Sequence, residues 1–195
     1  MSRARTNANN WAADITGVTA STGLTGGGTS GTVTVAIDST VTTLTGVQTL
    51  TNKTLTTPLL NNAIVRAPEE RWTVSATATT GTVNFDALTQ GVLYYTTNAS
   101  GNWTLNVRGD GSDTLNSILA TGDALTVAFL VTQGGTAYYQ TAFQVDGSSV
   151  TPKWSGGTAP SAGNTSGIDA YSFTIIKTAA TPTYTVLGAG PIKYA

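Results

Sequence analysis

From residue 72 onward, apolar and small polar side chains alternate in short runs that are separated by glycine-rich turns. Alternation with a period of two is typical of a strand that buries one of its faces. The pattern predicts a loop or a single helical turn over 113–119 and a long loop over 155–167. The strands that it predicts cover 72–79, 82–85, 92–97, 103–107, 124–132, 137–145, 150–154, 171–177 and 183–187.

Two connections between these runs carry the signature of β-hairpins. Gln133-Gly134-Gly135 joins two strongly apolar runs, and glycine there would supply the positive φ of a tight turn. The last two runs are predicted to form a second hairpin around Ala179–Pro182. Eight or nine strands in about 125 residues are typical of a sandwich. The fold is therefore predicted to be all-β, with an antiparallel, jelly-roll-like β-sandwich in the C-terminal part.

The first 68 residues follow another pattern, because their apolar residues are isolated and Trp11 is their only aromatic residue. Such a segment cannot close a core alone. Disorder is one interpretation, but a disordered polar linker does not keep inserting single leucines and valines. Three intertwined copies could bury these side chains along a shared axis. We therefore predict an extended trimeric stalk, whose contacts would be made by Val41, Leu44, Val47, Leu50, Leu55 and Leu60.

The low charge of the chain excludes several classes of partner. Only 10% of the 195 residues are charged and the formal net charge is −1, so no basic patch is available to neutralise phosphates. No run approaches the ~20 apolar residues of a membrane span. The first 20 residues lack the apolar core of a signal peptide. We expect neither nucleic acid nor a membrane as partner, and synthesis in a cytoplasm.

The residue types that carry most catalysis and metal binding are scarce. Cysteine and histidine are absent, which leaves no disulfide framework and no Cys/His zinc site. Most of the ten carboxylates stand in turns, as in Asp110-Gly111 and Asp146-Gly147. Asp110 and Asp113 could bind Ca²⁺, but they lack the remaining ligands of a calcium loop, and a polar turn is favoured. The sequence thus predicts no catalytic residue, no metal and no cofactor.

Aromatic residues near polar loops are candidates for stacking against sugar rings. Trp103, Tyr138, Tyr139 and Trp154 are the four that stand in such a context, and Asn98, Asn102 and Asn164 could add hydrogen bonds. The alternative is that these rings belong to the core of the sandwich or to a subunit contact.

One segment resembles a known family. Residues 46–58, Gly46 to Pro58, contain the run QTLTNKTLTTP. This run is similar to a signature of fibre and virion structural proteins of tailed phages, those of marine cyanobacteria among them. Residues 23–38 resemble the segment that often precedes this signature, and 125–177 resemble the terminal domain of cyanophage structural proteins.

The resemblance implies a homotrimer with a stalk and a head, located on the virion after assembly in the host cytoplasm. Residues 1–20 would be a particle-anchoring peptide that contacts other virion proteins through Arg3, Arg5 and Trp11. Residues 21–70 would form the stalk and 71–195 the head. The expected function is that of a short tail fibre or spike that contacts the host surface. A head fibre or capsid decoration protein, and a glycan-binding or glycan-cleaving spike, are the alternatives.

Overall fold

The computed structural model describes residues 17–43, 47, 49–55, 58–66 and 68–195. Arg3, Arg5, Trp11 and Leu44, to which the sequence assigns anchoring or stalk contacts, lie outside these residues. The chain divides into two compact units between Ala63 and Ile64. Each unit is described by itself. Within the described residues, no helix has the length and apolar character needed to cross a membrane.

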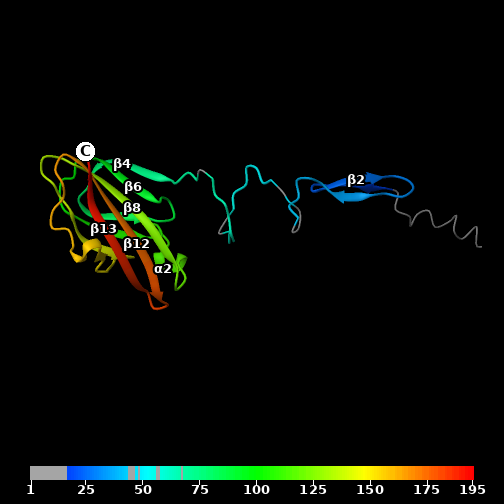
Figure 1. Ribbon diagram of the computed structural model, residues 1–195. Helices are drawn as coiled ribbons and strands as arrows, with labels where there is room; N and C mark the ends of the chain where they lie inside the picture. The colour runs from blue at the N-terminus through cyan, green and yellow to red at the C-terminus, as the bar shows by residue number, and fades with distance from the viewer. Residues whose placement is uncertain (1–16, 44–46, 48, 56–57, 67) are drawn as a thin grey trace, which may run out of the picture. The chain divides into compact units, whose positions relative to one another are not determined.

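The first unit contains a small antiparallel sheet in the order β1-β2-β3. Its strands are β1 (Val18–Thr19), β2 (Leu24–Gly28) and β3 (Val35–Ile37); β2 is labelled in Figure 1. No strand or helix follows among the described residues between β3 and residue 71. The strands of the predicted stalk region 21–70 are thus confined to its first third, and most described apolar side chains beyond them are exposed.

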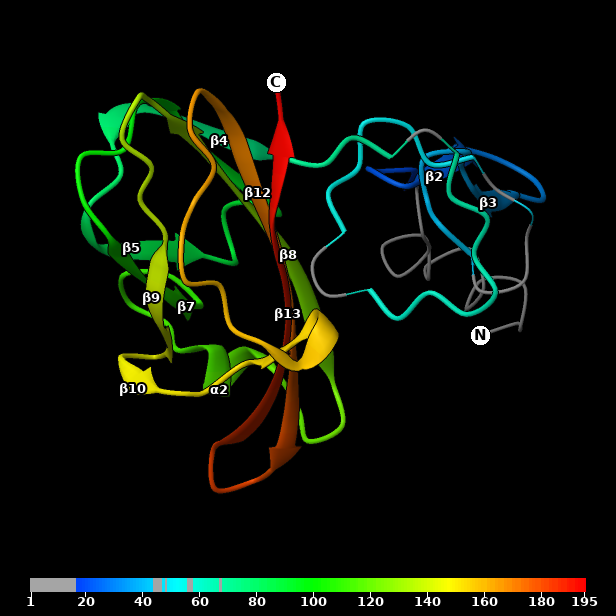
Figure 2. The same cartoon turned by 60° about the vertical axis from the view of Figure 1, so that its left-hand side comes forward.

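The second unit contains two sheets that face each other (Figure 2). One is six-stranded, in the order β11-β13-β12-β8-β6-β4, and the other is four-stranded, in the order β10-β9-β7-β5. The six-stranded sheet contains β4 (Trp72–Ala78), β6 (Val92–Thr97), β8 (Ala124–Gln133), β11 (Lys153–Trp154), β12 (Gly167–Ala179) and β13 (Thr183–Tyr194). The four-stranded sheet contains β5 (Gly81–Asp86), β7 (Trp103–Arg108), β9 (Gln140–Val145) and β10 (Ser148–Ser149). A single helical turn, α2 (Leu115–Ile118), and a 3₁₀ turn, η2 (Ser155–Gly157), complete the unit.

The positions of the strands confirm the alternation, but their pairing corrects the antiparallel prediction. From β4 to β9 the chain passes from one sheet to the other at every step, so that β4, β6 and β8 are parallel neighbours, as are β5, β7 and β9. Within the described residues of the second unit, antiparallel pairing joins only β8, β12 and β13, and β9 with β10. Parallel neighbours need a crossover, and here the strand of the opposite sheet provides it.

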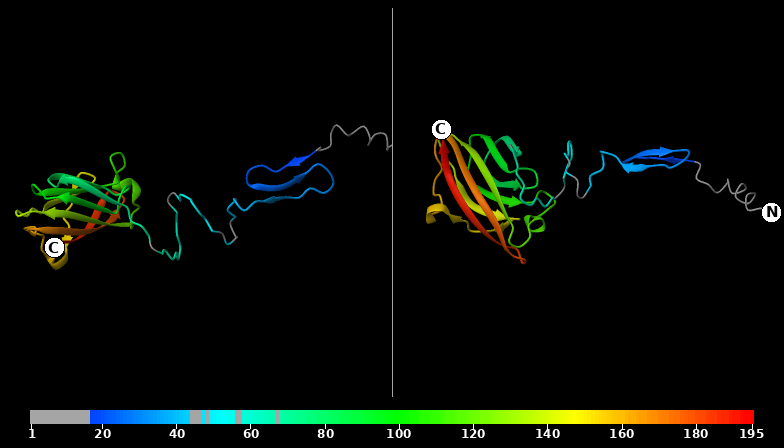
Figure 3. Two further views of the ribbon diagram at one scale, coloured as in Figure 1. Left: turned by 90° about the horizontal axis from the view of Figure 1, so that it is seen from above. Right: turned by 45° about the vertical axis from the view of Figure 1, so that its right-hand side comes forward.

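The predicted hairpin at Gly134-Gly135 is wrong for the same reason. β8 and β9 lie in different sheets, and neither glycine adopts a positive φ. A Cβ on Gly134 would lie 2.9 Å from Nδ2 of Asn98, so a larger residue there would displace the end of that side chain. The second hairpin is confirmed and longer than predicted, since β12 and β13 pair over most of their length (Figure 3).

The core lies between the two sheets. Its largest fully buried side chains are Trp103, Tyr171, Phe85, Phe129, Phe143 and Phe173. The Trp103 ring meets those of Phe129 and Tyr171 edge to face, with centroids 5.9 Å apart in both pairs. Such contacts are favoured by the ring quadrupoles and add to the burial of area. They join β7 of the four-stranded sheet to β8 and β12 of the six-stranded one.

Candidate functional site

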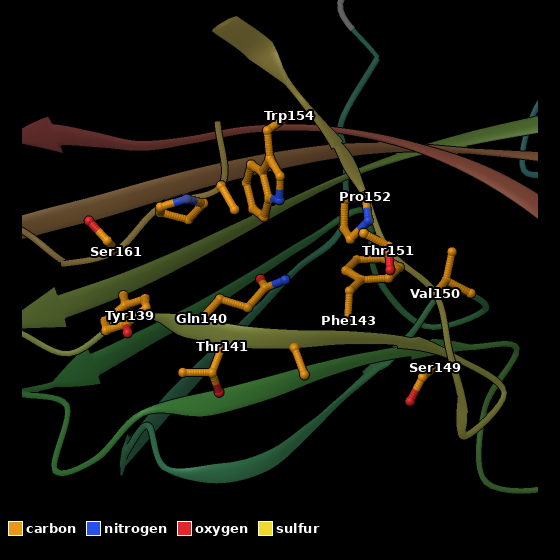
Figure 4. A pocket seen from close by; sticks show the side chains of 13 residues that line it. Tyr139, Gln140, Thr141, Phe143, Ser149, Val150, Thr151, Pro152, Trp154 and Ser161 are labelled. Atoms are coloured by element: carbon orange, nitrogen blue, oxygen red, sulfur yellow. The ribbon is translucent and has the colours of Figure 1, made fainter. Parts of the chain in front are cut away.

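A cleft of about 540 Å³ lies along β9 (Figure 4). One wall is β9 itself, and the other is built by residues 149–154 and by the loop that follows η2. None of the 13 described residues that line it carries a charge. Aromatic rings, hydroxyl groups and one amide remain, which suits a neutral ligand with both apolar faces and hydroxyl groups. The lining residues that supply polar atoms or rings are Tyr139, Gln140, Thr141, Phe143, Ser149, Thr151, Trp154 and Ser161.

Trp154 is fixed against the core by its own neighbours. Its ring packs edge to face on Phe173, with centroids 5.7 Å apart, and remains half-buried. A Cβ on Gly188, its register partner in β13, would lie only 3.1 Å from Cε3 of the indole. Glycine at 188 therefore lets the indole lie close to the strand, and Figure 4 shows the ring at the cleft.

Gln140 provides the most specific polar feature of the cleft. Its side chain is 4% exposed, and its Oε1 has no hydrogen-bond partner in the structure. In Figure 4 it extends from β9 into the space below Trp154. An unpaired buried acceptor costs about 1–3 kcal/mol. Its accessible surface is below 1 Å², so a donor such as a ligand hydroxyl group would satisfy it only after the side chain turns toward the cleft.

A buried carboxylate network fixes the loop that forms one wall. Asp169 is fully buried in β12 and accepts hydrogen bonds from the backbone N–H of Asn164 (2.9 Å), from Asn164 Nδ2 (2.7 Å) and from Gln133 Nε2 (3.1 Å). The side chain of Gln133 also donates a hydrogen bond to the backbone carbonyl of Tyr138 and accepts one from its backbone N–H. These bonds attach the segments before β9 and before β12 to the six-stranded sheet. They hold the flanks of the cleft.

Two of the four sequence-predicted glycan contacts, Tyr139 and Trp154, lie together in the cleft. The prediction that Trp103 contacts a glycan is wrong, because this residue is 1% exposed and packs in the core, where no ligand can reach it. Tyr138 is half-buried against the core and does not line the cleft. Asn102 accepts a hydrogen bond from the Tyr139 backbone through its Oδ1 and does not line the cleft. The sequence did not reveal Gln140 as a site residue. Polar and apolar residues alternate along a strand, and nothing in that pattern distinguishes this glutamine from other polar strand residues.

Several aspartates outside the cleft have structural partners. Asp86 pairs with Arg108 at 2.7 Å, and Asp146 accepts from the first two N–H groups of α2. Asp110 accepts from the backbone N–H groups of Ser112 and Asp113, as the predicted polar turn requires. The bond from Asp113, followed by that from Ser112, holds the pKa of Asp110 below its usual value. No cluster of three potential metal ligands occurs among the described residues.

The candidate stalk residues lie in the first unit, and most of them face solvent. Val47 is exposed at 107% of its reference area, and Leu50, Leu55 and Leu60 at 47–59%. Leu59, which the sequence analysis did not single out, is 87% exposed. Val41 is half-buried and lies beside Gly23. Large apolar side chains left in water along one segment mark a surface that another chain can cover.

Comparisons with protein families, with curated proteins and with solved structures find no match to this chain.

Two buried glutamines give a matched test of the cleft. We predict that Gln140→Met changes the free energy of unfolding by less than about 1 kcal/mol, because it removes an acceptor that is already unpaired. Gln133→Met should cost about 2–3 kcal/mol, since it strands hydrogen-bonding groups of Tyr138 and Asp169. Urea denaturation of both variants provides the comparison. Equal losses would mean that Gln140 is held by a partner and is not reserved for a ligand.

Proposed function

We propose that this chain is a structural protein of a tailed-phage particle, a short fibre or spike that associates with copies of itself and binds a neutral saccharide of the host surface. The observation that carries the proposal is the run of exposed leucines and valines in the first unit. The similarity of residues 46–58 to a signature of phage fibre proteins gives the run its biological context.

Self-association is supported by the apolar side chains that remain exposed in a single copy. Fully burying a leucine or valine contributes about 1.5–3 kcal/mol. Leu50, Leu55, Leu59 and Leu60 forgo about half of that or more in one chain. Three copies around one axis would place these residues in contact. Residues 1–20 would then attach the assembly to other virion proteins.

Saccharide binding is supported by the chemistry of the cleft. The half-buried indole of Trp154 offers an apolar face, and the unpaired Oε1 of Gln140 would become an acceptor beside it once that side chain turns toward the cleft. The lining has no charge, so a neutral sugar fits it better than a phosphorylated or sulfated one. The absence of carboxylates from this lining favours binding over cleavage. Weak sites repeated on an oligomer gain useful strength from avidity.

The leucines of the first unit allow a direct test of assembly. We expect the triple variant Leu50→Ser, Leu55→Ser, Leu60→Ser to dissociate at a protein concentration at least about a hundredfold higher than the unchanged chain, because the buried contact is lost. Sedimentation velocity over a dilution series measures this. The matched control is Thr49→Ser, Thr51→Ser, Thr54→Ser, which should behave as the unchanged chain. Identical dissociation of the two triple variants would contradict the stalk.

The saccharide site is tested with defined sugars. Methyl α-glucoside, methyl β-galactoside and methyl α-mannoside are the probes, and saturation-transfer NMR on the full chain detects binding. We expect at least one to bind, and Trp154→Ala to weaken that binding by about tenfold or more.

Leu88→Ala, a change at an exposed leucine outside the cleft, should leave the binding of the sugar unchanged. If none of the three probes shows saturation transfer, or if the Trp154→Ala variant shows the same transfer as the unchanged chain, the saccharide is removed from the proposal.

The capsid-decoration alternative has a test of its own. Phage particles that lack this protein, adsorb normally and lose stability would favour it.

A further inference from the structure

The outer face of the six-stranded sheet carries an apolar row that crosses five strands. The register aligns Val74, Tyr94, Leu130, Ala170 and Ile192, from β4, β6, β8, β12 and β13. The alternate residues of β8 and β12, among them Phe129 and Tyr171, are buried in the core, so this row points away from it. A sheet face turned to water is normally polar. Here Val74 and Ile192 are 61% and 54% exposed.

A second set of side chains widens the row into a groove of about 600 Å³. Trp72 and Tyr194, each more than half exposed, stand on β4 and β13. Ala128 and Ile168 lie on β8 and β12, two of the three strands between them. All residues that line this groove are uncharged. Toward the opposite end of the sheet the same face becomes polar, where the hydroxyl groups of Thr126 and Thr174 meet at 3.0 Å. The apolar surface is therefore confined to one part of the face.

Two further features concern β4, the strand that carries Trp72. β4 is the last strand of its sheet, and its sequence WTVSATA contains none of the charges or prolines that protect exposed edges. The chain approaches β4 from Ile64 and Val65, which are 87% and 62% exposed. Six residues lie between Val65 and Trp72, so at most about 23 Å of chain joins the exposed apolar segment to the groove.

The entry segment also carries balanced charges. Arg66, Glu69, Glu70 and Arg71 surround Pro68, and none of them forms an ion pair with another described residue. Two positive and two negative groups are complementary to the same four groups of another copy. A ligand of one charge would not be matched in this way.

We infer that the occupant of this groove is the same face of other copies of this chain. The inference rests on the self-association proposed above and adds a second contact in the head. If copies associate through the segment that ends at Val65, the short connection to Trp72 keeps their grooves near the symmetry axis. In a closed symmetric assembly, residues near the axis meet their own copies. The row would then form a shared apolar core at the axis, and the cleft would be lined by β9 of the other sheet and by β11, the edge strand opposite β4.

The absence of cysteine from the chain makes this contact easy to test. Single substitutions Val74→Cys, Leu130→Cys and Ile192→Cys place one thiol at a time along the row in the full chain. The control is Thr82→Cys, at an exposed position of β5 in the four-stranded sheet. We expect a short bis-maleimide to join copies through at least one row position and not through residue 82. We also expect the row thiols to react with a fluorescent maleimide about tenfold more slowly than the control thiol, because they are covered.

The outcomes separate this inference from the proposed function. A chain that sediments as an oligomer while its row thiols react as fast as the control thiol would overturn the inference and leave self-association standing. Equal cross-linking at residue 82 and along the row would overturn it as well, since the contact would be unspecific. A chain that sediments as a monomer and shows no cross-link would remove both.

Discussion

Ring contacts between Trp103, Phe129 and Tyr171 join the two sheets of the second unit, and the rest of that unit depends on them. The side chains come from β7, β8 and β12, so one cluster ties the parallel part of the fold to the long antiparallel hairpin. Phe173 extends the cluster to Phe143 and Trp154. The cleft along β9 is thus built on the end of the core, and its indole is held by the same packing that holds the sheets together.

The same constraint explains what the chain leaves exposed. One core between two sheets can cover only the inner faces, and the outer face of the six-stranded sheet keeps an apolar row from Val74 to Ile192. The described residues of the first unit include no buried hydrophobic side chain, and Leu59 and Leu60 stay in water. Exposed patches of this kind mark interaction surfaces. Both are explained by one proposal, in which copies of the chain cover each other.

The sequence predicted where the strands lie better than how they pair. Alternation shows which residues share a face, and it located β4 to β8 closely. It contains no information on which strand lies alongside, so the passage between sheets at every step was missed. Gly134 favoured a hairpin because glycine in a turn usually signals positive φ, whereas here it makes room for Asn98. Of the site, Tyr139 and Trp154 could be named from their polar context. Trp103 was misplaced because an aromatic residue in a strand does not reveal which way it faces, and Gln140 becomes notable only through its unpaired oxygen.

The central claim is that the exposed apolar surfaces of one chain are covered by other copies. The native mass of the unmodified full-length protein, measured by light scattering after size exclusion, tests it most directly. The account predicts a mass near three times the chain mass of 19.9 kDa. A mass of 19.9 kDa at every concentration tested would contradict it.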